Sequence, residues 1–422
     1  MIGMADPRAS DVRVPIDSDI LHMILEEAEL ETHKACSLVC HKWLDISRKF
    51  IFDLVVVRPA IPFDDFRLFL AAHRHVGVHV RDLHIHGSDD YNHPDGDLPP
   101  RRVDSWTLVE AAKSMPNVSS IQLRTVILVD APDEAMTGVA SLVGPIKLAK
   151  FSMLRCPYGY DHASASIENL FYLFEAETMQ IDLRNSRAPW GPASNPHDAT
   201  LNTPRWPIRH KHICLKAILD AVQTPFVFLT TFLVPGSLRR LHLAFYHWSH
   251  LDEMARFLQH SGESITEFTI SFAHALTRYS ANHKPSDEEW RAYNFSSLRN
   301  LSKLRFNLGS PLASHVADRP RLWTDTIGIP KFLACFPSDL PLHDGVAIDS
   351  WYRTRAFAKQ SLRYVTPRPE IEGALFRFDN LERVTLYSWS TCNDAEEIGA
   401  EAFPRLWKAK KLHFMHEVKE CC

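Results

Sequence analysis

A string of six residues recurs along this chain of 422 residues. In each copy an apolar or small residue is followed, three and five positions later, by two apolar residues, as in Leu238, Leu241 and Leu243. Such alternation is typical of a β-strand with one buried face. The copies occupy residues 80–85, 118–123, 148–153, 178–183, 238–243, 265–270, 301–306, 381–386 and 409–414.

Helical patterns precede several copies, for example Phe66, Phe69 and Leu70 before the first, and most copies lie about 30 residues apart. Units of this kind stack into a curved solenoid, with strands on the concave face and helices outside. The sequence therefore predicts an α/β fold with one parallel sheet. We expect its core to contain Leu83, Ile85, Ile121, Leu123, Ile181, Leu183, Leu241, Leu243, Phe268, Ile270, Leu304, Phe306, Val384, Leu386, Leu412 and Phe414.

Proline-rich stretches interrupt the period in two places, near residues 187–207 and 309–368. We interpret both as insertions, which in repeat proteins often carry binding residues because they stand off a rigid scaffold. The second stretch leaves room for one degenerate repeat between Trp351 and Val365.

The N-terminal residues 14–57 show a different pattern. Asp17 and Ser18 are good helix caps, and four apolar residues then follow at helical spacing: Ile20, Leu21, Ile24 and Leu25. A second helix is predicted from Glu31 onward, and it carries Leu38, Val39 and Trp43. A segment this short cannot bury much apolar surface alone. We therefore expect a helical module that keeps part of its apolar surface open for a partner.

The string Leu38-Val39-Cys40-His41-Lys42-Trp43, together with the stretch from Ile20 to Leu25, resembles an F-box. Pro15 stands about two residues further from the first helix than in the usual motif. The resemblance implies docking onto the Skp-type adaptor of a cullin–RING ubiquitin ligase. The residues that it implies for this contact are Pro15, Ile20, Leu21, Ile24, Leu25, Leu38, Val39 and Trp43.

Residues 60–422 resemble the irregular leucine-rich repeats that follow F-boxes in fungal proteins. The resemblance implies a substrate-recognition subunit that presents a protein target, while ubiquitin transfer takes place elsewhere in the complex. We expect the target on the concave strand face, where polar residues alternate with the buried ones. The candidates for this contact are His84, Gln122, Asp182, His242, Thr269, Arg305, Thr385 and His413.

Composition and motifs favour no enzymatic class. The formal net charge of -4 gives no reason to expect nucleic acid as a partner. Phosphate-binding and hydrolase motifs are absent from the sequence, so we expect neither a cofactor nor catalysis. His33, Cys36, Cys40 and His41 lack the second ligand pair of a structural zinc site, so no metal is expected. With no signal peptide and no apolar run of membrane-spanning length, the chain is expected in the cytoplasm or nucleus.

Two alternatives remain open. The N-terminal helices could simply cap a repeat scaffold that acts outside any ligase, and co-purification with the adaptor would separate this hypothesis from the first. An enzyme with an unrecognised site would instead show a cavity that gathers several titratable groups with shifted pKa values.

Overall fold

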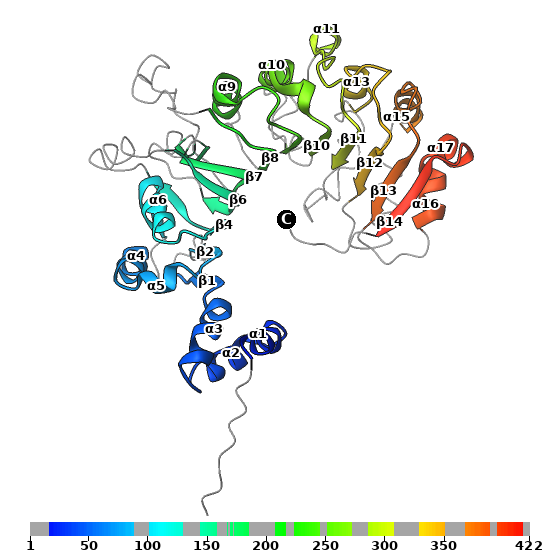
Figure 1. The fold of residues 1–422 in the computed structure, drawn as a ribbon. Coiled ribbons are helices and arrows are strands. Elements are labelled where there is room, and N and C mark those ends of the chain that lie inside the picture. The colour runs from blue at the N-terminus through cyan, green and yellow to red at the C-terminus, as the bar shows by residue number, and fades with distance from the viewer. Residues whose placement is uncertain are drawn as a thin grey trace, which may run out of the picture.

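The strands and helices of the protein form an open arc, with the strands along the inner side and most of the helices outside (Figure 1). The structure is a computed structural model. It describes residues 17–87, 101–129, 144–157, 167, 169–171, 173–184, 207–216, 223–244, 251–271, 286–307, 329–350, 368–388 and 395–416.

Three short helices stand at the N-terminal end of the arc: α1 (Ser18–Glu26), α2 (Leu30–Cys36) and α3 (His41–Ile51). Helix α1 begins where the sequence predicts, because the carboxylate of Asp17 accepts a hydrogen bond from the backbone N–H of Asp19 at 3.1 Å. The negative charge of Asp19 also suits the first turn of a helix.

The predicted second helix is two helices in the structure. Cys40 has an extended backbone, with φ of -166°, and forms the N-cap of α3. The chain therefore leaves the helical conformation between Cys36 and His41. As a result Leu38 and Val39 lie in a turn, not on a helix face.

One histidine joins the three N-terminal helices. The ring of His33 in α2 stacks on Phe50 of α3, with 4.9 Å between ring centroids. Its Nε2 atom lies 2.6 Å from the carbonyl oxygen of Leu25 in α1. The helices thus have a small core of their own.

The sheet has twelve strands, and every neighbouring pair is parallel. Its order follows the chain: β1 (Leu54–Val57), β2 (Asp82–His86), β4 (Ser120–Arg124), β6 (Ile146–Pro157), β7 (Phe174–Arg184), β8 (His212–Lys216), β9 (Arg240–Ala244), β10 (Glu267–Ser271), β11 (Lys303–Asn307), β12 (Gly345–Ser350), β13 (Val384–Ser388) and β14 (Leu412–His416). Strands β3 (Arg102–Asp104) and β5 (Ile127–Val129) form a separate parallel pair.

Most helices lie on the outer side of the arc (Figure 1). They are α4 (Phe63–Ala72), α5 (Arg74–Gly77), α6 (Ser105–Lys113), α9 (Gln223–Phe232), α10 (Leu251–Ser261), α11 (Asp287–Ala292), α13 (Ile329–Ala334), α15 (Arg368–Leu375), α16 (Ala395–Ala402) and α17 (Pro404–Lys408).

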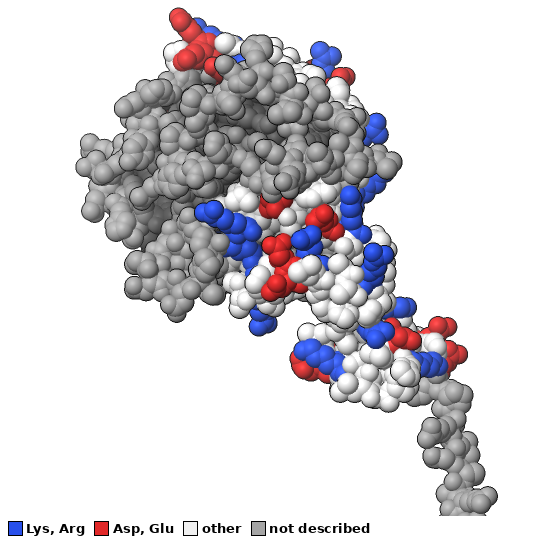
Figure 2. Space-filling model, turned by 90° about the vertical axis from the view of Figure 1, so that its left-hand side faces the viewer, with Lys and Arg blue, Asp and Glu red and all other residues white. Residues whose placement is uncertain are grey.

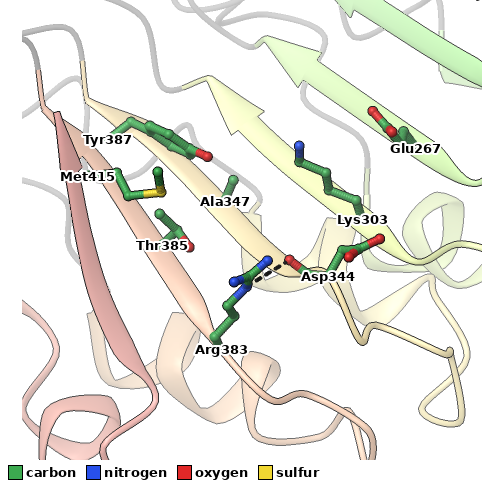
Figure 3. Close-up of a pocket in the computed structure, with 8 residues that line it drawn as sticks. All are labelled: Glu267, Lys303, Asp344, Ala347, Arg383, Thr385, Tyr387 and Met415. Atoms are coloured by element: carbon green, nitrogen blue, oxygen red, sulfur yellow. Dashed lines mark hydrogen bonds between the residues drawn. The ribbon is translucent and has the colours of Figure 1, made fainter. Parts of the chain in front are cut away.

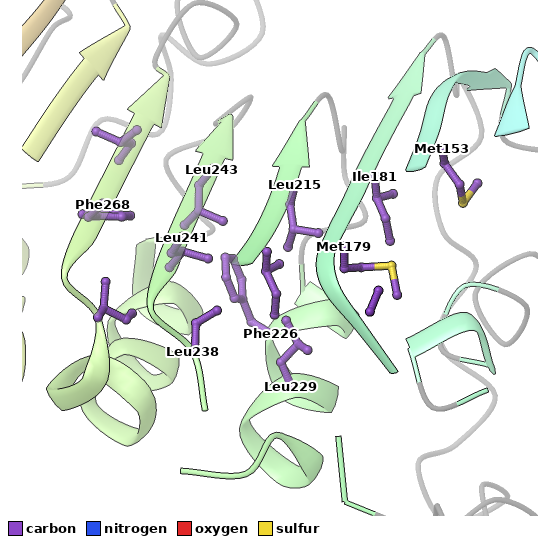
Figure 4. Close-up of a cluster of buried hydrophobic side chains, with 14 of the residues drawn as sticks. Met153, Met179, Ile181, Leu215, Phe226, Leu229, Leu238, Leu241, Leu243 and Phe268 are labelled. Atoms are coloured by element: carbon purple, nitrogen blue, oxygen red, sulfur yellow. The ribbon is translucent and has the colours of Figure 1, made fainter. Parts of the chain in front are cut away.

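The hydrophobic core lies between these helices and the sheet. Figure 4 shows Leu241 and Leu243 of β9 on the same side of the sheet as Phe226 of α9. The prediction of one parallel sheet is confirmed, and the predicted core residues whose side chains are described are buried, except the half-buried Phe414. The side chain of Leu183 lies outside the described residues.

The sequence pattern missed strands β8 and β12 because each lacks the expected leading residue. In β8 that position holds His210 in place of an aliphatic residue, and in β12 Leu342 stands one residue early relative to Val346. Strand β12 and helix α13 both lie within the stretch 309–368, so the interpretation of that stretch as one insertion is corrected. The proposed repeat between Trp351 and Val365, and almost all of the stretch 187–207, lie outside the described residues.

The first strand joins the N-terminal helices to the sheet. Residues 54–57, which the sequence pattern puts at the end of the N-terminal module, pair as β1 with β2, so β1 forms one edge of the sheet. Among the described residues, no helix is both long enough and apolar enough to cross a membrane.

Candidate functional site: an exposed helical face and a row of side chains along the sheet

The N-terminal helices and the segment that follows them carry an unusual share of the exposed apolar side chains, and six of these side chains belong to the helices and their connecting turn. Among the described residues, twelve of the fourteen large exposed hydrophobic side chains lie between residues 20 and 78. Such a concentration marks a contact surface more often than scattered single residues do. We define the helical face as Ile20, Met23, Ile24, Leu30, Leu38 and Val39.

The turn between α2 and α3 is the most exposed part of the helical face. The side chain of Leu38 is 87% exposed and that of Val39 is 64% exposed. Ile24 on α1 is 53% exposed. A partner that covers these side chains removes apolar surface from water, which favours association.

The predicted contact residues divide into two sets. Ile20, Ile24, Leu38 and Val39 are exposed, while Trp43 is half-buried. Leu21 and Leu25 are fully buried, which corrects their assignment as contact residues. In a helix, residues one apart point about 100° away from each other, so a run of adjacent apolar residues can serve both a core and an outer face. Pro15 lies outside the described residues.

Met23 and Leu30 of the helical face were not predicted. Met23 could have been found, because it stands three residues after Ile20 and therefore near it on the helix surface. Leu30 is the first residue of α2, and no spacing signal marks it.

The helices α1, α2 and α3 pack more closely with one another than with the sheet. They extend beyond the end of the arc (Figure 1), and Figure 2 also shows the N-terminal end as a projection from the body. On the face drawn in Figure 2, basic and acidic side chains are intermixed over the described surface and form no large patch of one sign.

The second candidate surface is a row of side chains across the concave face of the sheet. The strand registers place one residue from every strand in line, so that each is paired with its neighbours. We call this line the central row. It consists of Val56, His84, Gln122, Ser152, Gln180, Cys214, His242, Thr269, Arg305, Ala347, Thr385 and His413.

The structure brings seven of the eight predicted target residues into the central row and displaces one. Asp182 lies two residues further along β7, paired with Lys216, and Gln180 takes its place in the row. The correction arises because the fourth repeat copy begins at Ala176, two residues earlier than predicted. Thr385 is in the row but buried, while His413 is exposed.

Polar residues of the row are buried near its middle. Ser152 and Gln180 are buried, and neither Ser152 Oγ nor Gln180 Nε2 has a hydrogen-bond partner among the residues that the structure describes. A buried polar atom without a partner costs about 1–3 kcal/mol. Sequence reasoning did not select either residue, although Ser152 holds the expected position of its repeat.

Histidines lie near the N-terminal end of the row. His84 stands beside His86 with 6.2 Å between ring centroids. Partial burial lowers the pKa of His84 below its usual value of 6.5, and the neighbouring Lys150 lowers it further while Asp82 opposes the shift. The imidazole is therefore neutral at pH 7 and can both donate and accept a hydrogen bond.

The structure assembles no recognisable catalytic or metal-binding group in the part of the chain that it describes. No cluster of three or more histidine, cysteine, aspartate or glutamate side chains there could hold a metal ion. Cys156 is buried, and burial raises the pKa of its thiol to about 12, so it is not poised as a nucleophile.

Comparison with known proteins leaves the family open. The chain matches no model of a known protein family, and no curated protein shows significant sequence similarity to it.

Proposed function

We propose that this protein is a substrate-recognition subunit of a Skp–cullin–F-box ubiquitin ligase. The observation that carries the proposal is the exposed helical face, formed by apolar side chains of α1, α2 and the turn between α2 and α3, in a group of helices that stands off the body. The resemblance of residues 14–57 to an F-box identifies the expected partner as a Skp-type adaptor. In this proposal the adaptor covers Ile20, Ile24, Leu38 and Val39.

The packing of the helices favours docking over capping. A cap must cover the apolar side chains at the end of a repeat array. Here Leu54 and Val56 of the edge strand β1 remain exposed, and the helices pack chiefly with one another. The helices therefore do little to shield the end of the sheet.

The body, in this proposal, is an irregular leucine-rich-repeat domain that presents the target. Several positions of the central row, among them His84, Gln122, His242, Thr269, Arg305 and His413, present different half-buried or exposed polar side chains on a rigid sheet, which suits selective protein recognition. Ubiquitin transfer takes place on other subunits, so no residue of this chain is assigned a catalytic role.

Co-purification tests the adaptor contact. The full chain is co-expressed with a tagged Skp-type adaptor, and the variants Leu38→Asp and Ile24→Asp are compared with wild type. Because both side chains are largely exposed, these changes leave the fold intact and place a charge in the interface. We expect both to abolish co-purification.

The matched control is Leu68→Asp on α4, an apolar side chain that is 60% exposed but lies outside the helical face. This variant should co-purify like wild type. If Leu38→Asp and Ile24→Asp also co-purify like wild type, the adaptor does not use this face. If wild type itself is not retained, the result favours the non-ligase scaffold.

Cysteine labelling gives an independent test of the same contact. Cys40 is exposed and directly follows Val39, whereas Cys156 is buried. Maleimide labelling followed by mass spectrometry should modify Cys40 in the free protein and leave Cys156 unmodified. The adaptor should protect Cys40, and unchanged labelling of Cys40 in the complex would place the contact elsewhere.

A further inference from the structure

A small hollow lies on the concave face near the C-terminal end of the sheet. Its volume is about 210 Å³, and Figure 3 shows side chains from β10 to β14 around it. The lining residues are Glu267, Lys303, Asp344, Ala347, Arg383, Thr385, Tyr387 and Met415.

The hollow exists because β12 carries small residues where its neighbours carry long ones. Gly345 pairs with Lys303 of β11, and Ala347 pairs with Arg305 of β11 and Thr385 of β13. Gly345 has a φ of +82°, and a Cβ atom there would lie 2.5 Å from the carbonyl oxygen of Arg383. The backbone therefore requires glycine at this position, and the gap is built into the strand.

The acidic and basic side chains around the hollow do not all form ion pairs with one another. Glu267 lies between Arg240 and Lys303 in the sheet register, and its carboxylate pairs with Arg240, whose Nε is 3.2 Å away. Among the residues that the structure describes, no carboxylate forms an ion pair with Lys303. The ammonium group of Lys303 thus lines the hollow, beside the carboxylates of Glu267 and Asp344, without an ion-pair partner in the described part of the chain.

The second carboxylate beside the hollow is also engaged. The Oδ2 atom of Asp344 accepts a hydrogen bond from Ser302 Oγ at 2.9 Å. Arg383 donates from Nε to the backbone oxygen of Asp344 at 3.3 Å, not to its carboxylate. The two terminal nitrogens of the Arg383 guanidinium make no hydrogen bond within the described chain, so they remain available as donors.

A third cation, Arg305, contacts the ring of Tyr387, which lines the hollow. The guanidinium carbon of Arg305 lies 4.6 Å from the ring centroid of Tyr387. In Figure 3 the ammonium of Lys303, the guanidinium of Arg383 and the hydroxyl of Tyr387 are arranged around Ala347. Cationic donors that converge on one small space favour an anionic oxygen group, because charge-assisted hydrogen bonds are the strong ones.

We propose that this hollow binds an anionic side chain, a carboxylate or a phosphorylated residue, from an acidic segment of the target protein. The inference rests on the proposed function in that it takes the ligand to be a protein segment. The anionic group lies over Ala347 and accepts hydrogen bonds from Lys303 and Arg383, while the rest of the segment follows the sheet face.

Peptide binding to the full-length protein tests the proposal by fluorescence anisotropy. The probes are labelled decapeptides of alternating serine and glutamate, of serine and glutamine, and of serine and phosphoserine. The glutamine peptide should not bind. Binding of either acidic peptide supports the proposal, and the tighter of the two identifies the anionic group. If neither acidic peptide binds, the proposal is wrong.

Variants locate the binding. Lys303→Gln and Arg383→Gln should each weaken binding of the acidic peptide about tenfold, since each removes a charged hydrogen-bond donor. Ala347→Leu should abolish binding by filling the hollow, provided that circular dichroism shows an unchanged fold. The matched control is Lys150→Gln, which removes an exposed lysine from the same face at β6. An equal loss in the control would show general charge attraction and overturn the proposal.

Two further measurements complete the test. The first distinguishes a peptide site from a small-anion site, and the second asks whether the hollow and the adaptor contact act independently. If free glutarate or inorganic phosphate binds as tightly as the peptides, the hollow is a small-anion site and the peptide proposal fails. The Lys303→Gln variant should still co-purify with the Skp-type adaptor. If wild type binds the acidic peptide but not the adaptor, the proposed function is wrong and this inference stands. If wild type binds the adaptor but neither acidic peptide, the proposed function stands and this inference is wrong.

Discussion

The Nδ1 atom of His210 lies 2.9 Å from the carbonyl oxygen of Ala176, at the repeat position where neighbouring units such as that of Leu238 bury an aliphatic side chain. The Nε2 atom of the same ring lies 3.2 Å from the carbonyl oxygen of Phe171. Only a protonated ring can donate to both oxygens. Burial nevertheless lowers the pKa of His210 below its usual 6.5, because desolvation outweighs the two carbonyl contacts.

This arrangement makes stability depend on pH. Above about pH 6.5 the ring is neutral in both the folded and the unfolded chain. As the pH falls below that value, the unfolded chain takes up a proton first, so the free energy of unfolding decreases. Urea unfolding at pH 7.5 and pH 5.5 should show a lower midpoint at the acidic pH.

The His210→Gln variant should show a smaller change between the two pH values. His413→Gln, which changes an exposed histidine, should keep the wild-type difference. An unchanged pH dependence in His210→Gln would mean that other groups, such as His84, cause it.

Truncation of the core at Leu241 should be costly. This side chain is 1% exposed and belongs to the continuous core of the arc. Leu241→Ala should lower the free energy of unfolding by about 2–5 kcal/mol, because it removes buried apolar surface and leaves a cavity. Leu68→Ala on the surface of α4 should change it by less than about 0.5 kcal/mol. Equal effects in the two variants would contradict the described packing.

Arg101 holds the loop between β1 and α4. Its buried guanidinium donates to the carbonyl oxygens of Val57 at 2.9 Å, of Arg58 at 2.5 Å and of Pro59 at 3.2 Å, and also to that of Ile61. Arg101→Met should cost about 2–3 kcal/mol of stability, because it leaves the buried carbonyl oxygen of Val57 and three partly buried carbonyl oxygens without this donor.

Hydrogen exchange measured by mass spectrometry should become faster in residues 58–62 of this variant. The exposed neighbour Arg102 provides the control, and Arg102→Met should leave the exchange unchanged. Unaltered exchange in Arg101→Met would show that the loop is held by other contacts.

The Nε2 atom of Gln180, which is buried and makes no hydrogen bond within the described residues, should be replaceable at no cost. Gln180→Met keeps a similar length and removes this buried donor, so stability should rise by about 1 kcal/mol. Gln122→Met, at a half-buried position of the central row two strands away, should change stability by less than about 0.5 kcal/mol. A marked loss in Gln180→Met would reveal a partner for the amide in solution.

The sequence predicts the type of sheet well because the strand signal is local and repeated. The pairs Leu83 and Ile85, or Leu241 and Leu243, mark both the strand and its buried face. The signal fails where another interaction replaces the aliphatic residue, as the two carbonyl contacts do at His210. It also fails at β12, because the leading Leu342 stands four residues before Val346 instead of three.

The candidate sites depend on features that spacing cannot supply. Spacing puts Ile24 and Leu25 together, and only the packing of three helices shows that one is exposed and the other is buried. The hollow depends on side chains from β10 to β14, which are far apart in the sequence, and on the pairing of Glu267 with Arg240 rather than with Lys303. Which side chain of a neighbouring strand forms the ion pair cannot be predicted from the sequence of one repeat.

The order of the strands in the sheet is the order in which the ribosome makes them. Each strand after β1 therefore finds its pairing edge already synthesised, and none waits for a distant segment. Chain segments that pair with near neighbours close short loops and fold quickly. The helices α1 to α3 emerge before every strand of the sheet, so a partner can engage them while the later strands, including those around Ala347, are still being translated.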